Sequence, residues 1–154
     1  MGVVINRPTD MTYGMLFEKI GLTLSNADLA NQPVLFGGPV QPERGFVIHS
    51  LGSEWDSSIK ISEQVTLTTS KDILTAVAES NSPKRLLLSL GYAGWVAGQL
   101  EQEIAQNAWL SVKPKDQETL TKVLFDTPHE DQLNVAMSLL DFDPSMLSDT
   151  AGHA

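Results

Sequence analysis

A strand-like apolar run passes into a helix-like apolar repeat between Arg85 and Leu110. The run lies between Arg85 and Gly91, and its length and leucine content are typical of a strand buried on both faces. After a glycine-rich bend, apolar residues return at helical spacing, at Ala97, Leu100, Ile104 and Ala108. The pattern predicts a central strand, a glycine turn and an amphipathic helix.

The chain before this stretch alternates between short apolar runs and turn residues. We predict strands at Met1–Asn6, Pro33–Phe36, Gly45–Leu51, Ile59–Ile61 and Val65–Thr69. Asp10 or Thr12 is expected to cap a helix that runs to about Lys19, and Ser70 to cap another that ends near Ser80. Residues 23–32 are predicted to form a connector with room for one helical turn. The middle of the chain is therefore β-rich.

The chain after Leu110 is predicted to hold one more short strand and two covering helices. Leu110 and Val112 suggest the strand, and helices are expected to start at Asp116 and at Thr127–Pro128. Residues 143–154 carry little apolar weight and are predicted to be a frayed tail. No repeat or linker divides the sequence, which predicts one domain over residues 1–154.

Composition narrows the class of protein. The chain has 154 residues, 42% of them hydrophobic, and no cysteine, which excludes disulfides and thiolate chemistry. A formal net charge of −9 repels a phosphate backbone, so direct nucleic-acid binding is disfavoured. No apolar stretch is long enough for a membrane span and no signal peptide is seen, so we expect a soluble, cytoplasmic protein without membrane association.

The glycine bend invites comparison with a phosphate-binding loop, because strand, glycines and helix start are the parts of an anion site. The spacing of Gly91, Gly94 and Gly98 matches no nucleotide-binding motif, and no lysine follows. Glu101 and Glu103 would also repel a phosphate. A structural turn, in which glycines let strand and helix approach closely, is the favoured interpretation.

Aromatic and histidine side chains offer weaker candidates. Trp95 and Trp109 are expected to pack the helix onto the sheet, with a pocket-lining role for Trp95 as the alternative. His49 is interpreted as a satisfied strand histidine rather than a catalytic one, since His49 and Ser50 point to opposite faces. His129 at a helix start favours capping over metal binding. We predict no catalytic residues, no metal and no cofactor, which favours a non-enzymatic protein.

Three segments carry a family resemblance: GVVINRP at Gly2–Pro8, GGPV at Gly37–Val40 with GFVIHS after it, and GYAGWVAGQLEQEIAQNAWL at Gly91–Leu110. Together they resemble the bacterial YqgE/AlgH family. The resemblance implies an α/β (α+β) domain in which helices flank a bifurcated mixed sheet with a small closed β-barrel. Members are often labelled transcriptional regulators, and the family's biochemical activity is not established.

The resemblance also implies additional N-terminal β structure that this chain lacks. An uncovered sheet edge would follow, and with it pairing with a partner, a homo-oligomer or a distorted first strand. Because the sequence has no helix-turn-helix pattern and no basic stripe, and its net charge is −9, we expect a regulator that acts through protein partners rather than through DNA.

The alternative hypothesis is a small-molecule-binding domain or weak enzyme. Its pocket would lie at the glycine bends. The candidate ligand-binding residues are Arg7, Gly37, Gly38, Arg44, His49, Gly91, Gly94 and Trp95.

Overall fold

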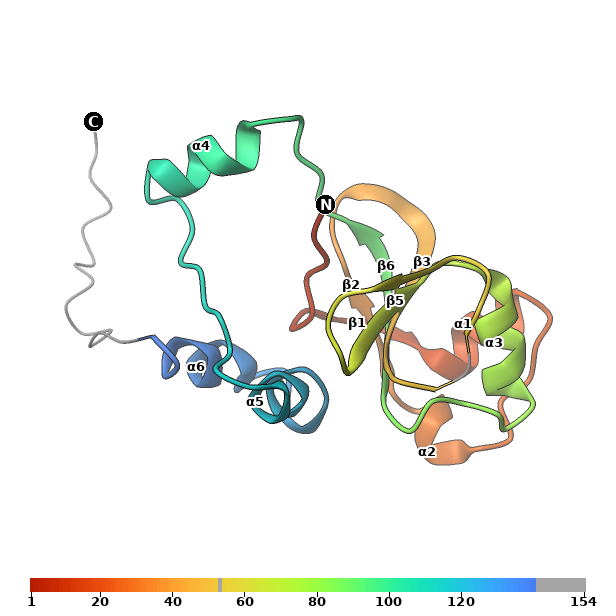
Figure 1. The fold of residues 1–154 in the computed structure, drawn as a ribbon. Coiled ribbons are helices and arrows are strands. Elements are labelled where there is room, and N and C mark those ends of the chain that lie inside the picture. The colour runs from red at the N-terminus through yellow and green to blue at the C-terminus, as the bar shows by residue number, and fades with distance from the viewer. Residues whose placement is uncertain (53, 141–154) are drawn as a thin grey trace.

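The computed structural model describes residues 1–52 and 54–140, and within them the chain forms a mixed sheet of six strands (Figure 1). The strand order is β1-β2-β6-β3-β5-β4. The strands are β1 (Pro8–Thr12), β2 (Pro33–Phe36), β3 (Val40–Ser50), β4 (Ser58–Lys60), β5 (Val65–Thr68) and β6 (Leu86–Tyr92). The helices are α1 (Tyr13–Lys19), α2 (Ala27–Ala30), α3 (Lys71–Ala78), α4 (Gln99–Ala105), α5 (Gln117–Thr121), the π-helix η1 (Lys122–Asp126) and α6 (Gln132–Met137).

Strand β6 lies inside the sheet, as the leucine run predicted. It pairs in parallel with β2, where Leu35 lies opposite Ser89, and antiparallel with β3, where Val47 lies opposite Leu88. A strand with neighbours on both sides satisfies its backbone groups while its side chains fill two cores. The central-strand prediction is therefore confirmed.

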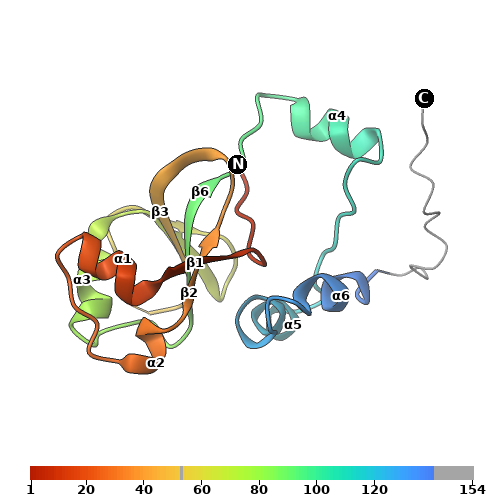
Figure 2. The ribbon, with the colours of Figure 1, turned by 180° about the vertical axis from the view of Figure 1, so that it is seen from behind.

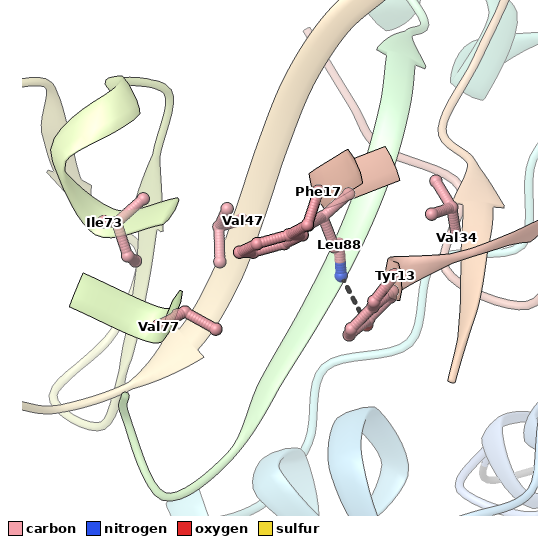
Figure 3. Packing of buried hydrophobic residues seen from close by; sticks show 7 residues of the cluster. All are labelled: Tyr13, Phe17, Val34, Val47, Ile73, Val77 and Leu88. Atoms are coloured by element: carbon pink, nitrogen blue, oxygen red, sulfur yellow. Dashed lines mark hydrogen bonds between the residues drawn. The ribbon is translucent and has the colours of Figure 1, made fainter. Parts of the chain in front are cut away.

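One face of the sheet is covered by α1, α2 and α3 (Figures 1 and 2). Figure 3 shows its core, where Phe17 of α1 lies over the strands between the α3 side chains and Tyr13. The fully buried members of this core are Tyr13, Phe17, Val34, Val47, Ile73, Val77 and Leu88. The helix predicted to begin at Asp10 or Thr12 uses Thr12, whose hydroxyl accepts a hydrogen bond from the Met15 N–H at 3.3 Å.

The opposite face carries a second, smaller core. Phe46, Ile48, Val65 and Leu67 are buried there, and Leu120, Leu124 and Phe125 of α5 and η1 pack against them. Val3 and Ile5 of the N-terminal segment cover the remainder. Helix α5 begins at the predicted cap Asp116, whose carboxylate accepts from the Thr119 N–H at 2.7 Å.

The prediction of a bifurcated sheet with a closed barrel is wrong. The six strands form one continuous sheet, and β1 and β4 end it on opposite sides, so it stays open. The mixed α and β content and the flanking helices are as predicted.

Two predicted strands are also absent from the described residues. Met1–Asn6 makes one isolated bridge, between Gly2 and Ala93, and the Val4 N–H donates to the Gly37 carbonyl at 2.9 Å. Leu110–Val112 forms no strand. In both segments the apolar spacing suits a strand, but no neighbouring strand offers a ladder of hydrogen bonds. The predicted tail at residues 143–154 lies outside the described residues.

Candidate functional site

The glycine bends predicted as a ligand site meet in space and pack backbone against backbone. A Cβ added to Gly37 would lie 2.3 Å from the Gly91 carbonyl oxygen, and one added to Gly91 would lie 2.2 Å from the Gly38 carbonyl oxygen. A Cβ on Gly38 would lie 2.2 Å from the Tyr92 carbonyl carbon. The close approach fills the space between these bends, and none of the three cavities described below is lined by them.

The other predicted ligand residues are dispersed. Arg7 lies over the Phe36 ring at 4.9 Å and Arg44 lies over the Phe46 ring at 5.7 Å, both exposed. Gly94 is exposed at the end of the bend, and Trp95 follows it. The structure thus brings Gly37, Gly38 and Gly91 together, while Arg7, Arg44 and His49 each lie against a different aromatic ring. A ligand shared by all eight residues stays a prediction.

His49 is fully buried on β3, and both of its ring nitrogens have partners. Nδ1 lies 2.9 Å from the Ser50 carbonyl oxygen and Nε2 lies 2.8 Å from the Thr68 hydroxyl. Burial lowers the pKa of His49, opposed by the hydrogen bond to Ser50, so the ring is neutral near pH 7. The Trp55 ring meets it edge to face, with centroids 4.9 Å apart.

The partners of His49 fix the direction of donation along a short series of hydrogen bonds. A carbonyl only accepts, so Nδ1 carries the proton and Nε2 accepts from Thr68. Thr68 must then accept from Ser58, whose hydroxyl lies 2.7 Å away on β4. This series of hydrogen bonds joins β3, β5 and β4, and both ring nitrogens of His49 take part in hydrogen bonds. The sequence could not give Thr68 and Ser58 as partners, because the pairing depends on strand register.

A loop from Gly94 to Pro114, which we call the arm, carries α4 away from the sheet (Figures 1 and 2). Its two tryptophans share one carboxylate: Trp95 Nε1 donates to Glu103 Oε2 at 3.0 Å and Trp109 Nε1 donates to the same oxygen at 2.7 Å. Their rings lie edge to face at 5.8 Å. The tryptophans therefore hold the arm together. The sequence had instead predicted that they pack α4 onto the sheet.

The apolar side chains of the arm remain in solvent. Val96 is 75% exposed, Ile104 43% and Trp109 48%. The arm has Glu101 and Glu103 as its acidic residues and no basic residue before Lys113. The helical periodicity correctly predicted which residues share a face of α4, but exposure of that face was not predicted.

Protonation of Glu103 is expected to open the arm. Hydrogen bonds from Trp109, Trp95 and Gln99 lower the pKa of Glu103 below the usual 4.5. Because the pKa of Glu103 is lowered in the folded state, the ionised carboxylate stabilises the folded arm at pH values above 4.5. This stabilisation is lost as the pH falls through the lowered pKa. In NMR spectra, the indole N–H signals of Trp95 and Trp109 should therefore shift together in acid.

Glu103→Gln is the matched control for this titration, because Trp55 lies against His49 and its signal can follow the protonation of that ring. In Glu103→Gln the joint acid shift of Trp95 and Trp109 should disappear. An unchanged joint titration of Trp95 and Trp109 in the variant would contradict the assignment.

Three cavities accompany these features. One cavity of about 640 Å³ lies beside an ion pair, in which Arg85 Nη2 lies 2.9 Å from Asp126 Oδ2. Another, of about 390 Å³, lies beside His49 and Trp55. The third, of about 250 Å³, lies between α1, α3 and the sheet. Among residues 1–52 and 54–140, no three His, Asp or Glu side chains are grouped as metal ligands, and no helix could cross a bilayer.

The open six-stranded sheet and its helices define a mixed α and β protein. An AlgH-like family model matches residues 1–145, and the chain belongs to this family.

Its relatives are somewhat longer than this chain. A UPF0301 protein of Bordetella petrii is 53% identical over all 154 residues, which span 74% of that protein, and one of Chromobacterium violaceum is 49% identical with 80% spanned. The solution structure of the AlgH protein of Pseudomonas aeruginosa is similar to this chain, with a TM-score of 0.75 and 41% sequence identity. The match covers 100% of this chain and 79% of the Pseudomonas chain.

Proposed function

We propose that this chain is a regulatory protein of the bacterial cytoplasm that acts through a protein partner bound to the arm, and not by contact with DNA. The observation that supports the proposal is the exposure of four large apolar side chains on one projecting segment, Val96, Ile104, Trp109 and Leu110. Aromatic and aliphatic side chains that stand in water on a projecting segment are typical of interaction surfaces. The acidic net charge argues against a DNA target.

The chemistry of the arm indicates what kind of partner it binds. Its apolar surface is accompanied by Glu101 and Glu103 and by no cation before Lys113. A second copy would bring the same charges, on a chain whose net charge is already −9. The occupant that fits is a partner segment with apolar anchors and lysine or arginine at its rim.

Photo-crosslinking tests this proposal with a matched control. A photoreactive residue is placed at Val96 on the arm and, in a second variant, at Ile61, which is also exposed but lies beyond β4. In cells, the arm variant should capture a defined protein through a basic, apolar segment, and the Ile61 variant should not. Ile104→Ser should weaken the purified complex at least about tenfold, the loss expected for one anchor side chain.

Other occupants of the arm are distinguishable outcomes that would contradict the proposal. Crosslinks from position 96 to another copy of the chain would indicate self-association. Crosslinks, in a longer relative, to that relative's additional segment would make the arm part of the domain's own core. A salt-dependent affinity for duplex DNA at micromolar concentration or tighter would overturn the regulatory mechanism.

A further inference from the structure

Gly45 occupies a position where neither a positive φ nor close packing requires glycine, and it ends a stretch in which the register of β3 against β6 is irregular. It lies in β3 opposite Leu90, and its φ is not among the positive values of the chain. A Cβ added there would meet no heavy atom within 4 Å. Glycine inside a strand is unfavourable, and it often marks a bulge or a place where a ligand approaches the backbone.

The empty space over Gly45 belongs to the cavity of about 250 Å³ between α1, α3 and the sheet. Gly45 lies on the same face as Val47 and Leu88, because strand residues two apart share a face and opposite partners do so too. The apolar part of the wall comes from four elements, α1, β3, α3 and β6. It consists of Leu16, Ile20, Val47, Leu74, Leu88 and Leu90.

The rim of this cavity is polar. Lys71, Glu43 and Arg44 line it, but the Arg44 guanidinium lies over Phe46, which is buried on the other face of the sheet, so Lys71 is the cation available to an anion here. Lys71 is exposed at the start of α3, and neither cation forms an ion pair within the described part of the chain. Arg44 is partly engaged, since it donates to the Gln41 side chain at 3.3 Å and lies over Phe46.

We propose that this cavity, which we call the Gly45 cavity, binds a small amphiphilic carboxylate. The alkyl or aryl body would lie over Gly45 between the leucines of α1, α3 and β6, and the carboxylate would face Lys71. An apolar wall with few polar groups at one end is the usual composition of a small-molecule site. The volume is below the roughly 300–1,000 Å³ of drug-sized sites, so a short chain or a single ring fits best.

This site is separate from the glycine bends and from the arm. Its wall includes Arg44 but no other residue of the eight predicted from the sequence. It also shares no residue with the arm, which begins at Gly94. Failure of one proposal therefore leaves the other standing.

Octanoate, octylamine and octanol are the probes, because they share one chain and differ in head-group charge. Each is titrated into the protein, and the methyl signals of Leu16, Leu74 and Leu90 are followed by NMR. Octanoate should shift these signals in a saturable way, and octylamine should bind at least tenfold more weakly. Absence of a saturable shift with octanoate, or equal binding of octylamine, would overturn the proposal.

Gly45→Val is the decisive variant, since it fills the cavity with a residue that strands favour. It should reduce octanoate affinity at least tenfold without lowering the melting temperature. Lys71→Gln should weaken octanoate but leave octanol unchanged, and Lys60→Gln, on β4, should change neither. If Gly45→Val does not fold, Leu74→Phe fills the same space from α3. Wild-type affinity in a folded cavity-filling variant would refute the assignment.

Discussion

Replacing Gly91 with alanine is expected to remove most of the stability of the fold. Gly91 has a φ of 74°, where a side chain costs about 1–2 kcal/mol. The new Cβ would also lie 2.2 Å from the Gly38 carbonyl oxygen, a backbone atom that cannot move away alone. The total loss should reach about 4 kcal/mol or more, which belongs to the rare, severe class of single substitutions.

Gly98→Ala is the matched control, because it separates the two costs. Gly98 has nearly the same φ, 80°, but a Cβ there meets nothing within 4 Å. Only the conformational cost of about 1–2 kcal/mol should remain.

Thermal unfolding followed by circular dichroism measures both variants. At about 2–4 °C for each kcal/mol, Gly91→Ala should melt at least about 8 °C below the wild type, and Gly98→Ala clearly closer to it. Equal melting temperatures for the two variants would show that the contact with Gly38 is not a constraint.

The contact behind this prediction shows where sequence reasoning ends. The glycine spacing at residues 91–98 predicted a turn and argued against a phosphate loop. It could not show that Gly37 and Gly38, more than fifty positions earlier, press against the same turn, because that follows from the parallel pairing of β2 with β6. A local sequence pattern predicts the conformation of a glycine turn. Which other segment packs against that turn depends on the topology of the sheet.

Helix α4 gives the complementary example. Its period correctly predicted an amphipathic helix with Leu100 and Ile104 on one side, but the same period was read as evidence of burial. Periodicity reports which residues share a face and not whether another element covers it. The exposed arm therefore emerged only from the three-dimensional arrangement, in which α4 stands away from the sheet (Figure 1).

The barrel expectation failed for a different reason. It came from the family resemblance and not from the residues, whereas the strands read from the residues at 33–36, 59–61 and 65–69 are close to those observed. Short-range alternation predicts strands well, but closure of a sheet depends on which strands meet at its ends. Here those strands are β1 and β4, which remain unpaired with each other.

The second large effect is expected at Tyr13, which completes the hydrogen bonding of the central strand. Its hydroxyl oxygen accepts a hydrogen bond from the Leu88 N–H at 2.8 Å, inside the core shown in Figure 3. Tyr13→Phe keeps the ring and leaves this buried N–H without an acceptor. The variant should be less stable by about 1–3 kcal/mol at neutral pH, as measured by urea unfolding.

Alkaline pH should erase this difference. Burial raises the pKa of Tyr13 to about 12 from 10.0, although the hydrogen bond from Leu88 lowers it. A raised pKa in the folded state means that the unfolded chain loses its phenol proton first, so stability is unaffected below 10 and falls as the pH rises toward 12. At about 1.4 kcal/mol per pH unit, the wild type should lose on the order of 2–3 kcal/mol.

Tyr13→Phe lacks this ionisation but keeps Tyr92 and every lysine, so it corrects for all other alkaline effects. The stability curves of the two proteins should be separated near pH 7 and converge as the pH approaches 12. Urea unfolding at several pH values between 7 and 12 would measure both curves. Parallel curves would mean that the Tyr13 hydroxyl is not buried against Leu88, and the core packing of α1 on β6 would then need to be revised.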